Sequence, residues 1–449
     1  MNRFQTTRGA AWCLGALVAT GNLQRSSGTD WPEFRGPERA GIWNADGLVE
    51  NFDGLADPLP RVWSSPVGAG YSGPTVAGDA VYLMDRGEAD QEDSNVERVL
   101  SFDRATGERN WAFSYAAPYA DVGYAYGPRS SVTIRDGKAF SLGMMGHLHC
   151  LDVSDGNPVW SKDLAAEYRV DMPIWGLASS PLVEGSRVIV QAAAKEDGAC
   201  VVAFDTKTGE EVWRAFDDKA SYVSPVVIEQ AGERVLVVWT GERVAGMDPA
   251  TGEVHWEVAT PFGKWPINVP GPAFNHDATL MFLSTFQEGS RLVELDQSEP
   301  AAKELWHRQG INERKTEAIH NMISPPYFHD GYIYGIDSYG QLRCLDPETG
   351  ERVWENTEAI PQGRWGTGFM VRNGDRTWIV SERGDLVVAR LTPDGYEEID
   401  RARLLEPTTP LKQRPEGAVL WSHPAFAGTR IFARNDRELV CVDLSRPAE

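Results

Sequence analysis

The sequence lacks the short motifs that identify several common enzyme classes. It contains no Gly-x-Ser-x-Gly nucleophile elbow, no phosphate-binding P-loop and no His-Glu-x-x-His metal motif. These absences argue against an α/β-hydrolase, a P-loop nucleotide hydrolase and a zinc metalloprotease. A long amphipathic helical pattern is also missing, whereas alternating apolar residues bounded by Gly, Asp and Asn recur along the chain and predict strands.

Basic residues are scarce relative to acidic ones. The 449 residues include 43 Lys and Arg against 65 Asp and Glu, which gives a net charge of −22. Such a surface repels phosphate backbones and anionic membranes, so nucleic acid is not expected as a partner. The densest acidic run, Glu88 to Asp93, lacks the ligand spacing of a calcium loop, and we interpret it as a solvated hairpin tip.

The apolar stretch near the N-terminus is too short to cross a membrane as a helix. It covers 13 residues, 9–21, and follows Arg3 and Arg8, which is the order and length of a signal peptide. We therefore predict a signal peptide over 1–21, a polar spacer over 22–30 and an exported domain over 31–449, located in the periplasm or cell envelope. A retained N-terminal anchor is the alternative.

One short motif recurs along the chain. Asp is followed by Gly four residues later and by Trp eight residues later in five copies, which begin at Asp103, Asp152, Asp205, Asp248 and Asp346. Asp is expected to accept backbone N–H groups in a tight turn, and Gly to take the left-handed conformation that other residues enter at a cost. Each copy therefore predicts a β-hairpin whose second strand ends in Trp.

Three further units keep the phase of this repeat but depart from its motif. They contain Asp296, Leu386 to Leu391, and Leu439 to Asp443, whereas Trp63 near the start lies on a strand without a preceding hairpin. The two ends of the chain thus complete one unit, and repeats of this length indicate a propeller or solenoid. We predict an all-β fold: an eight-bladed β-propeller of four-stranded antiparallel blades, closed by the N- and C-terminal strands. Trp31 to Pro37 and Trp43 are expected to pack across the ring.

Cysteine is rare, with four residues after the predicted leader. An even number in an exported protein allows a disulfide interpretation. However, Cys150, Cys344 and Cys441 each stand two residues before the Asp of a unit, where other units have Ala203 or Gly246. We therefore predict that they are small core residues of separate blades.

Long, varied loops precede the first strand of each unit. We call them the axial loops, because a propeller places them on one face beside its central channel. Their aromatic, amide, imidazole and guanidinium groups would suit a planar or anionic ligand; alternatively, the aromatic residues plug the channel mouth and the polar groups bond the loop backbone. Tyr222, Trp265, Arg364 and Trp421 lie in these loops, and the candidate ligand-binding residues are Tyr126, Arg129, Trp175, Asn268, His320, Asn321, Trp365 and His423.

A histidine pair elsewhere could supply metal ligands. His147 and His149 share one face of a predicted strand, but no third ligand is near in the sequence. We interpret the pair as structural and predict no metal site.

The unit from Ala203 to Trp213 resembles the tryptophan-docking repeat of the pyrroloquinoline quinone β-propeller superfamily, and the resemblance covers residues 63–443. It implies an eight-bladed propeller in which each repeat Trp packs against the hairpin of the neighbouring blade. The superfamily contains calcium-dependent quinoprotein dehydrogenases and non-catalytic envelope proteins similar to BamB, a subunit of the outer-membrane β-barrel assembly machine. The docking residues implied are Trp63, Trp111, Trp160, Trp213, Trp256, Trp306 and Trp354.

The resemblance to the enzymes is incomplete. The alcohol dehydrogenases place a vicinal Cys-Cys disulfide beside the quinone, and no two Cys adjoin here; a haem-binding Cys-x-x-Cys-His is also missing. The Glu, Asn and Asp ligands of the calcium that polarises the quinone carbonyl have no clear counterparts on the axial loops.

We therefore predict a BamB-like, non-catalytic and monomeric scaffold without a resident cofactor. It would bind an envelope protein or a small ligand on its loop face. The alternative is a dehydrogenase that holds pyrroloquinoline quinone and calcium near Arg129, Trp175, Asn268 and Trp365.

Overall fold

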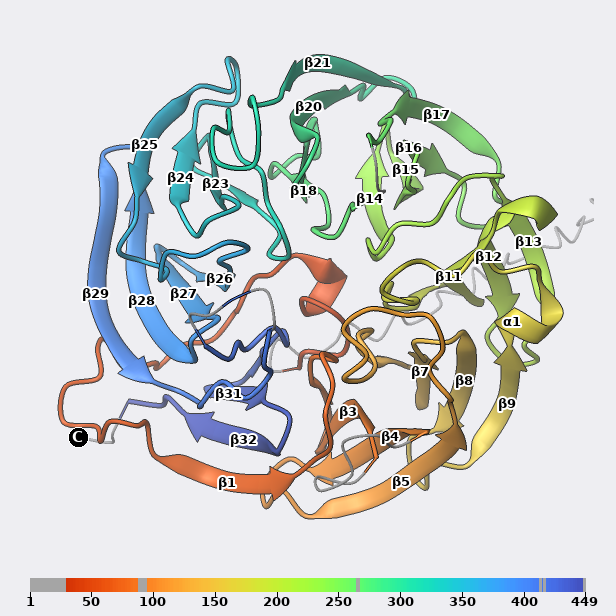
Figure 1. Cartoon of the computed structure of the whole chain (residues 1–449), viewed down its shortest axis with the longest axis horizontal. Coiled ribbons are helices and arrows are strands. Elements are labelled where there is room, and N and C mark those ends of the chain that lie inside the picture. The colour runs from red at the N-terminus through yellow and green to blue at the C-terminus, as the bar shows by residue number, and fades with distance from the viewer. Residues whose placement is uncertain (1–29, 88–94, 264–266, 412–413, 415–416, 447–449) are drawn as a thin grey trace, which may run out of the picture.

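The computed structural model describes residues 30–87, 95–263, 267–411, 414 and 417–446. Within these ranges, the strands form eight four-stranded antiparallel sheets arranged as a ring (Figure 1). The predicted eight-bladed propeller is confirmed. Its closure is confirmed as well, because β1 (Arg61–Pro66) pairs with β32 (Glu438–Asp443). The predicted leader, the acidic run Glu88–Asp93 and Trp265 lie outside the described residues.

The chain runs outward through each blade, so that the fourth strand lies on the rim of the ring (Figure 1). Blade 1 contains β2 (Thr75–Ala77), β3 (Ala80–Arg86), β4 (Val96–Asp103) and β5 (Arg109–Ala116). Blade 2 contains β6 (Thr133–Arg135), β7 (Lys138–Leu142), β8 (His147–Asp152) and β9 (Pro158–Asp163). Blade 3 contains β10 (Leu182–Glu184), β11 (Arg187–Ala194), β12 (Ala199–Asp205) and β13 (Glu211–Ala215). Blade 4 contains β14 (Val226–Gln230), β15 (Glu233–Trp239), β16 (Arg243–Met247) and β17 (Val254–Ala259).

The second half of the ring repeats this order. Blade 5 contains β18 (Ala273–Phe274), β19 (Leu280–Thr285), β20 (Gly289–Leu295) and β21 (Ala302–Arg308). Blade 6 contains β22 (Tyr327–His329), β23 (Tyr332–Ile336), β24 (Leu342–Leu345) and β25 (Arg352–Asn356). Blade 7 contains β26 (Gly368–Asn373), β27 (Arg376–Ser381), β28 (Asp385–Thr392) and β29 (Gly395–Arg403). Blade 8 contains β30 (Ala425–Ala427), β31 (Arg430–Arg434), β32 and β1.

Helical structure is confined to single turns outside the sheets. They are η1 (Pro37–Arg39), α1 (Leu164–Glu167) and η2 (Lys195–Asp197). In the described part of the chain, none of the helices has the length and apolar character needed to span a membrane.

Several of the innermost strands begin directly after a proline. The strand β2 begins at Thr75, immediately after Pro74. The strands β10 and β22 likewise begin directly after a proline. Proline has no backbone N–H to donate to the sheet, so the hydrogen-bonded ladder starts at the residue that follows it.

The repeat Trp joins neighbouring blades wherever it is present. The indole N–H of Trp111 donates to the carbonyl oxygen of Val153 in the Asp/Gly turn of blade 2, over 2.9 Å. The indole also packs on Gly156 of that turn, where φ is 75° and an added Cβ would lie 2.5 Å from the ring. Gly is therefore required for its conformation and for its missing side chain. Equivalent bonds join Trp63 to Arg104, Trp160 to Thr206, Trp213 to Pro249, Trp306 to Pro347, and Trp354 to Thr392.

Trp256 reaches the next blade through an amide side chain. Its indole N–H donates to Oε1 of Gln230 over 2.9 Å. The Nε2 of Gln230 in turn donates to the carbonyl oxygens of Asp296 and Ala301 in blade 5, over 3.2 and 2.7 Å. The turn of blade 5 is two residues longer than the repeat, and the glutamine amide spans the difference.

The N-terminal segment connects the two blades that no repeat Trp joins. Ile399 occupies the Trp position of β29. Trp43, which is only 2% exposed, packs instead between Trp378 of blade 7 and Phe426 of blade 8, with ring centroids 5.2 and 5.0 Å away. Its indole N–H donates to the carbonyl oxygen of Gly428 over 2.7 Å. A tryptophan from outside the repeat thus supplies the missing contact.

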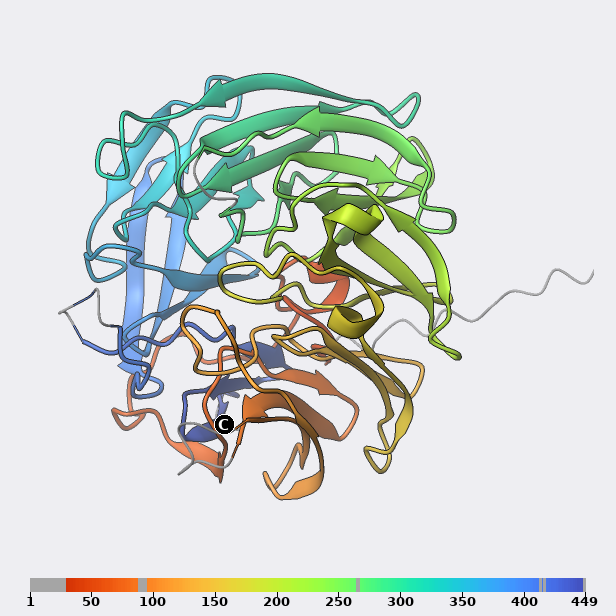
Figure 2. The same cartoon turned by 45° about the vertical axis from the view of Figure 1, so that its right-hand side comes forward.

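Residues 30–42 cross the centre of the ring, as predicted (Figures 1 and 2). Trp31 pairs with Val76 of blade 1, and Ile42 pairs with Arg372 of blade 7. The buried Arg39 forms an ion pair of 2.9 Å with Glu33 and donates to backbone carbonyl oxygens at the entrances to blades 3 and 4. One segment therefore ties together blades on opposite sides of the ring.

Small residues face the repeat Trp across most of the sheets, whereas Leu292 lies opposite Trp306 in blade 5. Cys150, Cys344 and Cys441 lie directly opposite Trp160, Trp354 and Trp63, and all three are buried and free of disulfides. The prediction that they are core residues is confirmed. Their size leaves room for the indole of the neighbouring strand.

Gly246 lies in the same position, opposite Trp256, and an added Cβ would come within 2.2 Å of the indole. We expect Gly246→Ala to lower the free energy of unfolding by about 1–3 kcal/mol, because the indole would have to leave its site. Chemical denaturation of both proteins would measure the difference. Gly271→Ala is the matched control, since nothing lies within 4 Å of its added Cβ. Equal stability of the two variants would contradict the proposed steric role.

Candidate functional site

All eight axial loops contribute to one cavity on the axis of the ring, which we call the axial cavity. Its volume is about 140 Å³, against the roughly 10–15 Å³ that one water needs. Phe34 is contributed by the N-terminal segment, and every other lining residue belongs to an axial loop. Those residues are Tyr71, Tyr124, Arg129, Trp175, Ala178, Ser180, Tyr222, Ser224, Val269, Met322, Ile323, Trp365, Trp421 and His423.

Aromatic rings form a connected part of the wall. The centroid of Trp175 lies 5.1 Å from that of Tyr222 and 6.2 Å from that of Tyr124. Trp421 continues the wall, with its centroid 6.3 Å from Tyr124 and 6.4 Å from Tyr71. Rings at these separations pack favourably against one another and present a stiff apolar surface. This wall suits the flat or apolar body of a small molecule.

Arg129 is the charged residue among those that line the axial cavity. Its Nε donates to the carbonyl oxygen of Trp175 over 2.7 Å, and its Nη2 donates to those of Gly123 and Tyr124, each over 2.9 Å. Its guanidinium lies over the Tyr71 ring, 4.7 Å from the centroid. Backbone carbonyls therefore orient Arg129 without neutralising its charge.

A second arginine stacks at Trp365. The guanidinium of Arg364 lies 4.6 Å from the centroid of the indole, and its Nη2 forms an ion pair of 2.7 Å with Glu313. Unlike Arg129, this arginine is neutralised by a carboxylate and does not line the axial cavity.

Burial fixes the protonation states of the titratable groups in the wall. Desolvation raises the pKa of Tyr222 to about 12 and raises the pKa of Tyr71 further. Desolvation, with a smaller contribution from the charge of Arg35, lowers the pKa of His423 to about 3. Desolvation also raises the pKa of Tyr124. At neutral pH the wall therefore presents three protonated tyrosines and a neutral imidazole.

The structure brings together four of the eight predicted residues: Arg129, Trp175, Trp365 and His423. Tyr126 lies outside the axial cavity, and its hydroxyl donates to the carbonyl oxygen of Pro410 over 3.1 Å. Asn268 is 3% exposed, and its amide donates to the carbonyl oxygen of Thr240 over 2.8 Å. Both side chains bond loop backbone, which is the alternative that the sequence left open for the polar groups.

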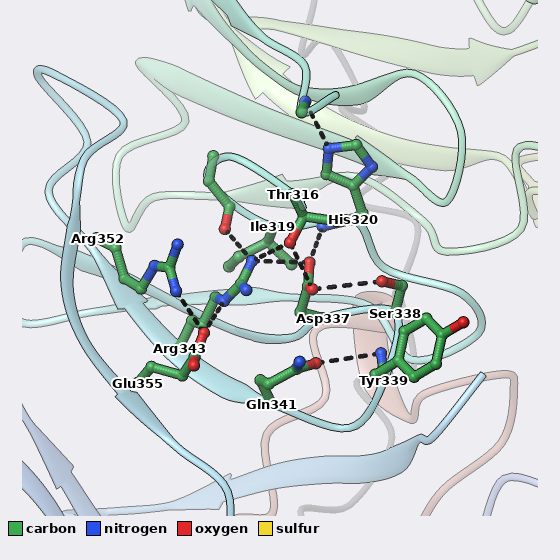
Figure 3. A network of polar contacts seen from close by, with 12 residues as sticks. Thr316, Ile319, His320, Asp337, Ser338, Tyr339, Gln341, Arg343, Arg352 and Glu355 are labelled. Carbon is green, nitrogen blue, oxygen red and sulfur yellow. Dashed lines mark hydrogen bonds and ion pairs between the residues drawn. The ribbon is translucent and has the colours of Figure 1, made fainter. Parts of the chain in front are cut away.

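His320 and Asn321 also bond backbone in the axial loop before β22. Figure 3 shows the network around His320. The Nδ1 of His320 donates to the Phe286 carbonyl oxygen over 3.0 Å, and its Nε2 accepts from the backbone of Gly310 over 3.2 Å. The backbone N–H of His320 donates to Asp337, which forms an ion pair of 2.9 Å with Arg343. The amide of Asn321 donates to the carbonyl oxygens of Ser324 and Ile336.

The candidate list missed lining residues that share one position in the repeat. Several axial loops end in a Ser shortly before the first strand, and the residue immediately before this Ser faces the axial cavity. The position immediately before this Ser would have identified Tyr71 and Ile323, and it also identifies Arg129. The residues in this position are Tyr71, Arg129, Ala178, Ile323 and Trp421.

The wall does not fit a calcium ion. No Asp, Glu, Asn or Gln is among the described residues that line it, whereas calcium takes six to eight oxygen ligands, several of them carboxylates. No group of three His, Cys, Asp or Glu side chains in the described part of the chain could hold a metal. His147 and His149 stack 6.5 Å apart between centroids, and His149 bonds to Ser161. This arrangement accords with a structural role for the pair.

Sequence comparison relates the chain to a family described by outer-membrane protein assembly. The profile of the family described as "Outer membrane protein assembly factor BamB" matches residues 95–356, more than half of the chain. The protein of that name from Burkholderia pseudomallei (strain K96243) is 23% identical over 330 residues. The match spans 72% of this chain and 66% of the relative, just under two thirds of its length.

Solved structures of two kinds share the fold. BamB from Moraxella catarrhalis has a TM-score of 0.56 at 15% identity, over 87% of this chain and 99% of that one. Quinohemoprotein alcohol dehydrogenase from Comamonas testosteroni has a TM-score of 0.65 at 14% identity, over 94% and 81%. A europium-containing methanol dehydrogenase has a TM-score of 0.66 at 14% identity, over 91% and 90%. Similarity at these identities extends to the propeller fold alone.

Acidification should destabilise the protein through His423. Its pKa is about 3 in the folded protein, against an ordinary value of 6.5. The contribution of neutral His423 to the free energy of unfolding is therefore complete above pH 6.5 and is lost as the pH falls towards 3. Because glutamine does not titrate, His423→Gln should show a shallower fall in the free energy of unfolding across this range, by up to about 1.4 kcal/mol per pH unit.

Urea denaturation at a series of pH values would measure these slopes. His255→Gln, at an exposed position on β17, is the matched control and should keep the slope of the wild type. An identical slope for wild type and His423→Gln would contradict the assignment.

Proposed function

The chain belongs to the family described as outer membrane protein assembly factor BamB, and from this premise we propose that it is an exported, non-catalytic binding propeller of the cell envelope. Its axial face would hold an envelope protein or a small ligand, and its predicted leader would direct export. The Asp/Gly hairpins on the opposite face would only maintain the ring.

The composition of the axial cavity is the observation that carries this proposal. Eight loops converge there, as in a binding site, yet no carboxylate and no thiol is among the described residues of the wall. Its imidazole is His423, which lies between Phe34 and Phe369 with ring centroids 4.6 and 4.0 Å away. Acid–base or nucleophilic catalysis needs paired groups within hydrogen-bond reach of each other. The described wall supports recognition and offers no such pair.

The alternative is a quinone-dependent oxidoreductase. It is favoured by the fold shared with the two dehydrogenases and by indoles beside an arginine at the axis. Asn268, which this alternative would place near the cofactors, bonds Thr240 away from the axial cavity. Pyrroloquinoline quinone would supply the redox chemistry if bound, with Arg129, Trp175 and Trp365 as its contacts.

A cofactor titration separates the two functions. We expect pyrroloquinoline quinone with calcium to give no calcium-dependent rise in melting temperature and no reduction of an electron-accepting dye by alcohols or aldoses. The reason is that the described wall offers no carboxylate or amide oxygen for the ion. Calcium-dependent, saturable quenching of Trp fluorescence together with turnover would establish the oxidoreductase instead.

Cross-linking from the axial face tests the binding function. Ile311 is 83% exposed in the axial loop before β22. A photo-cross-linking phenylalanine derivative in its place should capture one defined envelope protein in the cells that produce this chain. The same derivative in place of the exposed Lys207, in the Asp/Gly turn of blade 3 on the opposite face, is the control. Equal products from both positions would contradict a specific axial face.

A further inference from the structure

Three hydroxyls of the axial cavity accept a hydrogen bond from the backbone and keep a proton to donate. The hydroxyl of Ser180 accepts from the backbone N–H of Ser131, and that of Ser224 accepts from the backbone N–H of Ser180, over 2.9 and 2.8 Å. The hydroxyl of Tyr222 accepts from the backbone N–H of Trp175 over 3.3 Å. Within the described residues, none of these three hydroxyls donates to a protein acceptor. Each therefore has a proton to offer to a ligand.

Two further donors lie together on one side of the axial cavity. The hydroxyl of Tyr71 makes no hydrogen bond of regular geometry to a described residue, although it interacts with the Arg129 side chain and its residue is only 6% exposed. Arg129 lies over the same ring, and its Nη1 makes no hydrogen bond to a described residue. A buried polar group without a hydrogen bond of regular geometry is costly and calls for an explanation. A ligand that accepts hydrogen bonds at this point would remove the cost.

The described wall of the axial cavity has a positive charge that no described carboxylate balances. Arg129 forms no ion pair with a described carboxylate, and no Asp or Glu is among the described residues that line the wall, even though the protein carries a net charge of −22. The neighbouring Arg364 is already neutralised by Glu313. The described wall of the axial cavity therefore carries one positive charge, which a ligand with one negative charge would match. A polyanion would leave its remaining charges unpaired in an apolar site.

The remaining lining residues indicate which kind of ligand body the axial cavity would accept. The other lining residues include Trp365, Trp421 and Phe34, together with the aliphatic side chains of Val269 and Ile323. The indole N–H of Trp421 already donates to Glu382 over 3.2 Å, so these groups offer no hydrogen bonds other than the indole N–H of Trp365. They gain by contact with an apolar or aromatic body. The aromatic faces beside Arg129 and Arg364 are already covered by cations of the protein, which leaves them unsuited to a cationic ligand.

We propose that the axial cavity binds a small monocarboxylate with an apolar or aromatic body, its carboxylate held by Arg129 and the Tyr71 hydroxyl and its body packed against Trp175 and Trp421. This inference rests on the proposed binding function of the axial face and specifies the class of its small ligand. Neither a quinone nor a metal is required. Charge-assisted bonds to a guanidinium are about twice as strong as neutral ones, so charge should dominate selection.

Three probes of one shape test the proposal: 3-phenylpropionate, its neutral amide and 3-phenylpropylamine. In calorimetric titrations of the full chain, we expect the carboxylate to bind about tenfold or more tightly than the amide, and the amine not to bind at millimolar concentration. The proposal would be overturned by equal affinity for the carboxylate and the amide, by tighter binding of the amine, or by no binding of any probe.

Two variants locate the carboxylate. Arg129→Met should abolish the preference for carboxylate over amide while leaving amide binding within about twofold. Tyr71→Phe should weaken carboxylate binding and raise the melting temperature of the free protein, because it removes a buried hydroxyl without a hydrogen bond of regular geometry. Arg364→Met is the matched control and should retain the full preference. Unchanged preference in both Arg129→Met and Tyr71→Phe would contradict the assigned site.

The outcomes also separate this inference from the function on which it rests. Cross-linking from position 311 without any binding of carboxylates would refute the ligand class and leave the binding propeller in place. Quinone- and calcium-dependent turnover would refute the binding propeller itself.

Discussion

The indole of the repeat Trp is the contact on which the ring depends. It packs on the Gly of the next blade and donates its N–H to a backbone carbonyl of the same turn, as Trp111 does with Gly156 and Val153. Where the next turn has the repeat Gly, the indole packs directly on it, and most sheets place a small residue opposite the indole. Three of the four Cys after residue 21 occupy this small position, which accounts for their burial as free thiols.

The exceptions show that each gap between blades must be filled in some way. Where the turn of blade 5 is longer, Gln230 extends the reach of Trp256. Where blade 7 has Ile399 in place of Trp, the N-terminal segment inserts Trp43. The same segment continues from the axis, where Phe34 lines the axial cavity. Closure of the ring and construction of the candidate site are therefore connected through one stretch of chain.

The polar residues of the axial loops divide into two groups. Asn268, His320 and Asn321 form hydrogen bonds with loop backbone, whose polar groups need partners when they are buried. Tyr71, Ser180, Tyr222 and Ser224 retain hydroxyl donors at the wall, beside an arginine that no carboxylate neutralises. The first group makes the loops rigid, and the second is available for recognition. Rigid loops that present free donors are a preorganised site, which reduces the cost of ordering on binding.

The sequence by itself determined the fold, because the Asp/Gly/Trp spacing encodes a local turn and one contact with the next unit. Repetition of that pair of interactions leaves little choice but a ring, and eight units with complementary ends set its size. It also identified the axial loops as the site of variation, and Arg129, Trp175, Trp365 and His423 within them.

Only the tertiary structure decided which polar residues of those loops face the axis. A loop has no period from which the direction of a side chain follows, so Asn321 and Arg129 looked alike in the sequence. Their fates differ because Asn321 meets carbonyl oxygens of its own blade, whereas Arg129 is held by carbonyls with one nitrogen still free. The contacts that settle this come from segments distant in the chain.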